Sequence, residues 1–132
     1  MGETEVLPIA QEADVVIVRQ RVRARSAELR FSLVDQTKLV TAASELARNA
    51  LIYGGGGEAR IEAVTSGARR GLRITFTDQG PGIPNIAEAM RDGYTTGVGL
   101  GLGLGGAKRL VNEFEIDSVV GRGTRIAITR WA

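Results

Sequence analysis

Apolar residues recur with helical periodicity in two segments near the beginning of the chain. Over residues 12–29 they are spaced by three, four and seven positions and include Val15, Val18, Val22 and Leu29. Over residues 34–53 a longer apolar stripe consists of Leu39, Ala43, Leu46, Ala50 and Leu51. Both patterns predict helices, and the glycine run that begins at Gly54 predicts the end of the second one.

Alternation of apolar and polar residues replaces this periodicity further along the chain. Residues 59–63 and 72–77 alternate on either side of Ser66-Gly67-Ala68, which predicts a β-hairpin that ends at Asp78. Pro81, Gly82 and Pro84 enforce a turn after Asp78, and a short helix is predicted to follow at 86–91.

The last part of the chain repeats the strand pattern. A helix is predicted at 106–113, followed by strands at 115–120 and 124–131 with Gly121-Arg122-Gly123 as a tight turn between them. The complete order predicts an α/β fold, a two-layer α/β sandwich in which helices cover one face of a mainly antiparallel mixed sheet.

Length and composition limit what this fold can carry. With 132 residues, 43% of them hydrophobic, the chain is expected to form a single domain over residues 1–132. Its longest apolar run, at 15–18, is far shorter than the roughly 20 residues of a membrane span, and its N-terminus lacks the pattern of an export signal. We therefore expect a cytoplasmic protein with no membrane partner.

The residue types that are missing exclude several chemistries. The sequence contains neither cysteine nor histidine, so thiol redox chemistry, thiolate metal sites and phosphohistidine intermediates are ruled out on this chain. A net charge of only +2 makes a nucleic-acid partner unexpected. DNA binding through the arginines of 19–25 is a distant alternative, because that helix needs its apolar face for packing.

Two polar side chains lie one helical turn apart in the second predicted helix. Glu45 and Asn49 are separated by four residues, so both project from one face. An amide oxygen is a suitable ligand for Mg²⁺ beside phosphate oxygens, and a neighbouring carboxylate can accept a proton from an attacking hydroxyl. From spacing alone, two ordinary surface residues are the commoner explanation.

The turn Asp78-Gln79-Gly80-Pro81-Gly82 follows directly after a predicted strand. Glycine lets a flat ring approach the main chain, and a carboxylate at the head of the turn can accept a hydrogen bond from an exocyclic amine such as that of adenine. A turn that uses these residues for its geometry alone is an equally good explanation.

The third element is the glycine-rich run from Gly97 to Gly106, in which glycine alternates with leucine. It leads into a predicted helix and presents unhindered backbone amides, which favours phosphate binding. A Rossmann fingerprint is disfavoured because no strand precedes it, and no Walker A sequence is present. A flexible linker is the remaining alternative.

Taken in order, these motifs resemble those of the GHKL ATPase superfamily with its Bergerat nucleotide fold. Residues 45–49 (Glu-Leu-Ala-Arg-Asn) are similar to the N box, residues 78–82 and 99–103 to the two glycine boxes, and Gly123-Thr124 to the final box. Within this superfamily the chain resembles the switch serine/threonine kinases of the stressosome. The resemblance implies an ATP-dependent kinase that phosphorylates STAS-domain scaffold proteins and, once released, activates a PP2C-type phosphatase.

The resemblance also implies roles for individual residues. Glu45 would be the general base, Asn49 the Mg²⁺ ligand and Asp78 the partner of the adenine amine, while the other nucleotide-binding positions would be Gly80, Gly82, Gly99, Leu100, Gly101, Leu102, Gly103, Leu104 and Thr124. Residues 84–98 would form a lid over the nucleotide.

Phosphoryl transfer requires a cation near the γ-phosphate, and Arg91, Lys108 and Arg109 are the candidates near the lid. Each of them could equally be a solvated surface charge. Two functional alternatives stay open: an anti-sigma factor kinase that sequesters a sigma factor, and a module that acts mainly by binding the phosphatase. Arg48 favours the switch-kinase assignment, because a small or hydroxyl residue is expected there in the anti-sigma branch.

Overall fold

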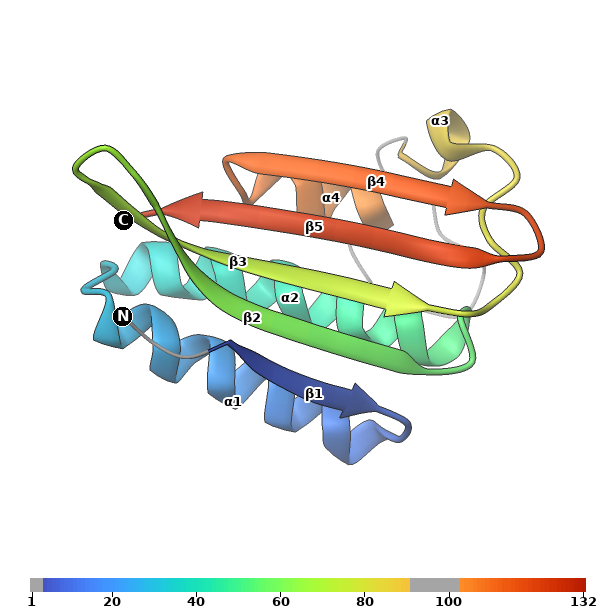
Figure 1. Ribbon diagram of the computed structural model, residues 1–132, viewed down its shortest axis with the longest axis horizontal. Coiled ribbons are helices and arrows are strands. Elements are labelled where there is room, and N and C mark those ends of the chain that lie inside the picture. Colours follow the sequence, from blue (N-terminus) through green and yellow to red (C-terminus); the bar gives the residue numbers. More distant parts are fainter. Residues whose placement is uncertain (1–3, 91–102) are drawn as a thin grey trace.

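The computed structural model describes residues 4–90 and 103–132. Its elements in chain order are β1 (Glu5–Ile9), α1 (Glu12–Glu28), α2 (Leu33–Ile52), β2 (Gly57–Ser66), β3 (Arg69–Asp78), α3 (Ile86–Ala89), α4 (Gly103–Arg109), β4 (Glu113–Val119) and β5 (Gly123–Trp131). Figure 1 shows the long strands crossing in front of α2.

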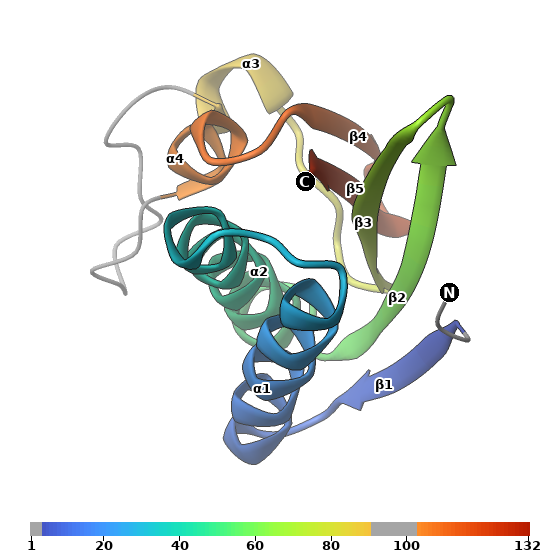
Figure 2. The ribbon, with the colours of Figure 1, turned by 90° about the vertical axis from the view of Figure 1, so that its left-hand side faces the viewer.

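The described strands form one five-stranded sheet in the order β1-β2-β3-β5-β4, and all four pairings are antiparallel. Helices α1, α2 and α4 lie on the same face of this sheet (Figure 2). The predicted two-layer α/β sandwich is therefore confirmed. Its core lies between the layers and includes Leu39, Leu46, Ile61, Ile74 and Ile128, all essentially inaccessible to solvent.

Both long helices match their predictions to within one residue. The first turn of α1 begins where the Asp14 carboxylate accepts hydrogen bonds from the backbone N–H groups of Ala10 and Gln11. At the start of α2 the Ser32 hydroxyl accepts the N–H of Asp35 at 3.1 Å, as an N-cap should. The ends of α2 are thus fixed by Ser32 and by the glycine run that begins at Gly54.

The sheet register brings the ends of the central strands together. In the β2–β3 hairpin Gly57 pairs with Asp78, and in the β3–β5 pair Asp78 faces Thr124. The hairpin turns at Gly67 and Ala68, as predicted, with Gly67 at φ 62°. Asp78 and Thr124, which are far apart in sequence, therefore lie side by side at one end of the sheet.

Strands β2, β3 and β4 differ from their predicted bounds by up to three residues at their ends, and two larger differences concern β1 and α4. The edge strand β1 was not predicted, because it is short and contains Pro8; it is held by pairing with β2 and by the Glu5–Arg21 ion pair at 2.7 Å. The helix predicted at 106–113 is wrong in its bounds, since α4 spans Gly103–Arg109 and the chain turns toward β4 from Leu110 onward.

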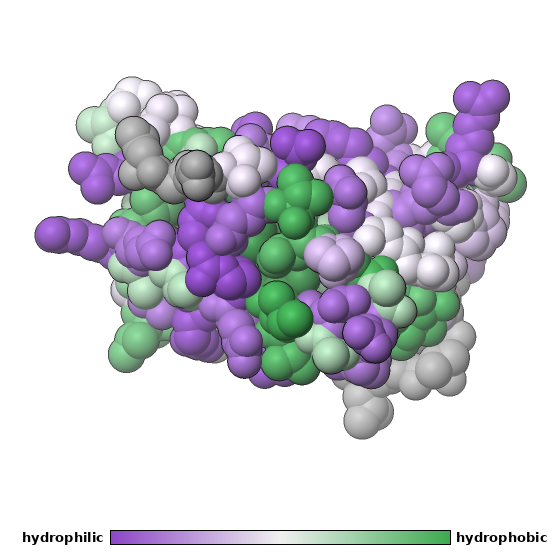
Figure 3. Space-filling model, turned by 60° about the horizontal axis from the view of Figure 1, so that its bottom comes forward, coloured by the Kyte–Doolittle hydropathy of each residue, from purple (hydrophilic) through white to green (hydrophobic). Residues whose placement is uncertain are grey.

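Hydrophobic side chains also reach the surface. Figure 3 shows them gathered between hydrophilic ones on the face that carries β1 and α1. The large exposed apolar residues of these two elements are Val6, Val16 and Ile17, each exposed by more than two fifths. No helix within residues 4–90 and 103–132 is long and apolar enough to cross a membrane.

Candidate functional site

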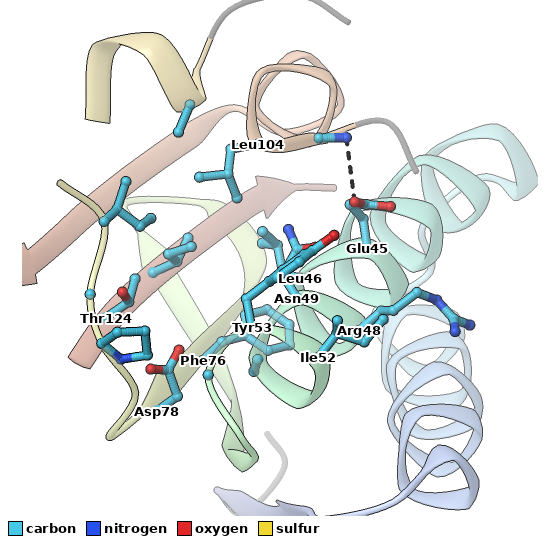
Figure 4. Close-up of a pocket in the computed structure, with 18 of the residues that line it drawn as sticks. Glu45, Leu46, Arg48, Asn49, Ile52, Tyr53, Phe76, Asp78, Leu104 and Thr124 are labelled. Atoms are coloured by element: carbon cyan, nitrogen blue, oxygen red, sulfur yellow. Dashed lines mark hydrogen bonds between the residues drawn. The ribbon is translucent and has the colours of Figure 1, made fainter. Parts of the chain in front are cut away.

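A pocket of about 230 Å³ opens between α2, the ends of β3 and β5, the 81–84 segment and α4 (Figure 4). Its walls are largely apolar, with Leu46, Ile52, Phe76, Ile83, Leu104 and Ile126 among them. The polar groups come from a small number of side chains at its two ends. This combination suits a flat, mostly apolar ring with a few polar handles.

Most predicted site residues that the structure describes line this single pocket. They are Glu45, Asn49, Asp78, Gly82, Gly103, Leu104 and Thr124. Gly80 is not in the wall, but its N–H donates to Asp78 Oδ1 at 2.9 Å. The predicted positions Arg91, Gly99, Leu100, Gly101 and Leu102 lie outside the described residues, as does most of the predicted lid.

The other two predicted cations lie elsewhere. Lys108 and Arg109 are exposed in the last turn of α4, and neither lines the pocket. Sequence reasoning placed them beside the glycine-rich run, whereas the helix carries them to its far end. Their proximity to a γ-phosphate stays a prediction.

Helix α2 supplies the carboxylate and the amide that sequence spacing singled out. The Glu45 carboxylate accepts the N–H of Gly103 at 3.3 Å, which joins α2 to the first residue of α4 (Figure 4). The backbone carbonyl of Asn49 accepts the N–H groups of Tyr53 and Gly54. Its side-chain amide forms no hydrogen bond with another described residue, so the amide oxygen can serve a ligand.

Asp78 is held by glycines on two sides. Its Oδ1 accepts the Gly80 N–H, and a Cβ added at Gly54 would approach its Oδ2 to 2.6 Å. Gly54 itself lies in the wall of the pocket, immediately after α2. Because neither glycine has a side chain, the Asp78 carboxylate can lie against both of them at the end of β3. Sequence reasoning did not predict this role of Gly54.

Ser118 on β4 is a second residue that sequence reasoning missed. Its hydroxyl accepts the N–H of Ile83 at 2.8 Å and lies 2.8 Å from the Thr124 hydroxyl. Ser118 and Thr124 face each other in the β4–β5 hairpin. The predicted turn at 121–123 could have indicated this pairing, because a short turn fixes which residues of two strands lie opposite.

The turn after Asp78 is tied to the same hairpin. The Pro81 carbonyl accepts the N–H of Gly121 at 2.8 Å, and Gly82 has a φ of 78°, which glycine adopts without strain. A Cβ at Gly82 would lie 2.5 Å from the Val119 carbonyl oxygen. The pocket wall from Pro81 to Ile83 is therefore held by contacts to β4 and to the β4–β5 turn.

Comparison with known proteins relates this site to a family. Residues 34–131 match the family described as histidine kinase-, DNA gyrase B-, and HSP90-like ATPase. The chain is 47% identical over 131 residues to the serine/threonine-protein kinase RsbT of Bacillus subtilis strain 168, covering 99% of this chain and 98% of that protein. It is 30% identical over 119 residues to an anti-sigma F factor of a Thermoanaerobacter species, covering 86% and 82%.

Solved structures show the same fold at lower identity. The RsbU and RsbW domains of a Mycobacterium tuberculosis protein align with a TM-score of 0.68 and 22% identity, covering 98% of this chain and 32% of that one. The mycobacterial sensor histidine kinase MprB aligns with a TM-score of 0.57 and 20% identity, covering 98% and 97%. Both likenesses concern the fold alone.

Proposed function

Because the chain belongs to the histidine kinase-, DNA gyrase B- and HSP90-like ATPase family and is a serine/threonine-protein kinase within it, we propose that its pocket transfers the γ-phosphoryl group of Mg-ATP to STAS-domain proteins. The observation that carries the proposal is the convergence of Glu45, Asn49 and Asp78 on one pocket. In this domain of residues 1–132, Glu45 would act on the nucleophile, Asn49 on the metal and Asp78 on the adenine base.

The adenine end of the nucleotide would lie at Asp78. Its carboxylate would accept a hydrogen bond from the exocyclic amine of adenine. Thr124, which is hydrogen-bonded to Ser118, would support the base, and Gly80 and Gly82 would shape the turn around it. The apolar wall formed by Phe76, Ile83 and Ile126 gives the ring its hydrophobic contact. A base without an exocyclic amine would leave the carboxylate unpaired and bind weakly.

The phosphate end would lie between α2 and the glycine-rich run. Asn49 would offer its amide oxygen to Mg²⁺, a cation that prefers oxygen ligands. Backbone amides from Gly99 to Leu104 would hold the phosphates, and residues 84–98 would close over them. Bound Mg²⁺ would neutralise phosphate charge, and the chain's own groups would orient the nucleotide.

Glu45 is the general base of this proposal. Its carboxylate lies at the phosphate end of the pocket, within a helical turn of Asn49 and hydrogen-bonded to Gly103. A carboxylate in that position can take the proton of a serine or threonine hydroxyl as the oxygen attacks phosphorus. Because the sequence has no histidine, the phosphoryl group would pass directly from ATP to the acceptor protein.

The proposed partners are cytoplasmic proteins of a partner-switching stress pathway. STAS-domain scaffold proteins are the substrates, and a PP2C-type phosphatase is activated once the kinase is released from them. The 47% identity to RsbT over nearly the whole chain favours this assignment. The second candidate, an anti-sigma factor kinase that sequesters a sigma factor, is favoured only by the 30% identity to anti-sigma F factors.

The experiment is a transfer assay with the purified chain, γ-labelled ATP, Mg²⁺ and the STAS proteins encoded beside its gene. We expect label on a STAS-protein serine or threonine and none on a sigma factor. Activation of the phosphatase is measured in parallel with wild-type protein and the Asn49→Ala variant. Stable, nucleotide-dependent binding of a sigma factor, with no transfer to any STAS protein, would replace the proposal by its alternative.

A further inference from the structure

Arg48 is the only lysine or arginine among the described residues that line the pocket. It lies on α2 between Glu45 and Ile52, three residues after Glu45, so its Cβ projects from nearly the same face. The pocket also contains the carboxylates of Glu45 and Asp78. Since ATP carries several negative charges, a site of this composition needs a cation at its phosphate end.

The guanidinium of Arg48 does not lie in the pocket. Figure 4 shows the side chain extended from α2 toward α1, where Nη1 lies 3.1 Å and 3.2 Å from the two carboxylate oxygens of Glu12. The two side chains are 41% and 64% exposed. Ion pairs this exposed contribute little to stability because water and salt screen them, so a stronger anion can draw the arginine away.

We propose that Arg48 is a phosphate-binding residue that leaves Glu12 and pairs with the γ-phosphoryl group when ATP occupies the pocket. The inference rests on the proposed function and adds a residue to which that function assigned no role. The planar guanidinium donates two parallel hydrogen bonds to phosphoryl oxygens, a geometry that lysine cannot reproduce. Glu12 holds the side chain at the rim of the pocket when no nucleotide is bound.

In the transfer step the acceptor's hydroxyl oxygen forms its bond to the γ-phosphorus, and the bond from phosphorus to the β,γ-bridging oxygen breaks. The hydroxyl proton passes to Glu45, and ADP leaves with the electron pair of the broken bond. Arg48 neutralises the charge on the γ-phosphoryl oxygens throughout.

Two variants of the full chain break the same ion pair and separate the proposed role from a structural one. Arg48→Met removes the cation and keeps the length of the side chain, whereas Glu12→Gln removes only its partner. Both are measured for the free energy of unfolding in urea, for ATP and ADP affinity by competition with a fluorescent nucleotide, and for transfer to the STAS acceptor. Arg48→Lys tests whether charge without the planar fork is sufficient.

We expect Arg48→Met to lower kcat for transfer at least tenfold and to abolish the preference for ATP over ADP. Glu12→Gln should retain wild-type transfer, and Arg48→Lys should recover only part of it. Equal losses in Arg48→Met and Glu12→Gln would make the pair a structural link between helices and overturn the inference, as would undiminished transfer by Arg48→Met. If the wild-type chain transfers nothing, the proposed function fails, while the ATP-over-ADP preference still tests Arg48.

Discussion

Gly54 and Asp78 approach each other so closely that a Cβ at position 54 would displace the Asp78 side chain. They are separated by 24 positions in the sequence and brought together by the β2–β3 register, in which Gly57 pairs with Asp78. A Cβ at Gly54 would lie 2.6 Å from Asp78 Oδ2. The carboxylate that we assign to adenine recognition therefore depends on a glycine at the end of α2.

Gly54→Ala should lower ATP affinity by about tenfold, because a displaced Asp78 costs roughly 1 to 3 kcal/mol, as overpacking does. Isothermal titration calorimetry measures the change. The control is Gly55→Asn in the same loop: Gly55 has a φ of 74° and open space around its Cβ, and asparagine tolerates that conformation. Equal loss of affinity in both variants would show that loop stability, and not Asp78, is responsible.

Ser118→Ala should weaken both the fold and the nucleotide site. The hydroxyl joins the Ile83 N–H to Thr124 Oγ1, and its loss leaves two partly buried groups without a partner, at about 1 to 3 kcal/mol. Urea unfolding and ATP titration measure the two effects. Ser66→Ala, at an exposed position at the end of β2, should change neither quantity. Unchanged ATP affinity in Ser118→Ala would show that the hydrogen bonds of Ser118 to Ile83 and Thr124 are not needed for nucleotide binding.

Asn49→Ala should remove the dependence of ATP binding on Mg²⁺. The wild-type chain is expected to bind ATP more tightly with Mg²⁺ than with EDTA, whereas the variant should bind similarly in both, because the amide oxygen that would reach the metal is gone. Gln20→Ala, which removes an exposed amide on α1, is the control. A variant that keeps the full Mg²⁺ effect would require another ligand for the metal.

Asp35→Asn should lower the free energy of unfolding by about 1 to 2 kcal/mol near neutral pH, since it weakens a charged hydrogen bond. The Asp35 carboxylate lies 2.6 Å from Arg130 Nη2, and Arg130 also donates to the Leu110 carbonyl at the end of α4. The hydrogen bond from Arg130, more than the opposing burial, holds the pKa of Asp35 below its ordinary value of 3.8.

The sign of the pH dependence follows from this shift. A carboxyl whose pKa is lower in the folded chain binds fewer protons there than in the unfolded chain. The stability from Asp35 is therefore complete above its ordinary pKa and is lost as the pH falls through the lower folded value. The difference between wild type and Asp35→Asn should narrow below about pH 4. Asp117→Asn, at an exposed position, is the matched control.

The sequence predicted the parts of the fold that local patterns determine. Helix α2 carries a regular apolar stripe and a glycine stop and was found to within one residue. The β2–β3 hairpin was found from its alternation around Gly67, although both strands are longer than predicted. Strand β1 was missed because five residues that contain a proline give too weak a pattern. The bounds of α4 were wrong because glycine and leucine alternate in a run that has no helical periodicity.

The residues of the candidate site also divide into those that local patterns indicate and those that only the fold brings together. Glu45 and Asn49 could be paired from their spacing, and Asp78 from its place after a strand. Gly54 and Ser118 could not, because each acts through a residue that only the sheet register brings near it. The ion pair between Arg48 and Glu12 joins two helices across 36 positions, which no local pattern indicates.

The proton acceptor for transfer is the central claim, and Glu45→Gln tests it most directly. Glutamine can still accept the Gly103 N–H that Glu45 accepts at 3.3 Å, so the phosphate end of the pocket should keep its shape, but its amide cannot take a proton. Glu115→Gln, at an exposed position on β4, is the matched control. We predict wild-type ATP affinity for Glu45→Gln and at least a hundredfold loss of phosphoryl transfer to the STAS acceptor, in the range that general-base catalysis contributes. Undiminished transfer by Glu45→Gln at unchanged ATP affinity would contradict the account.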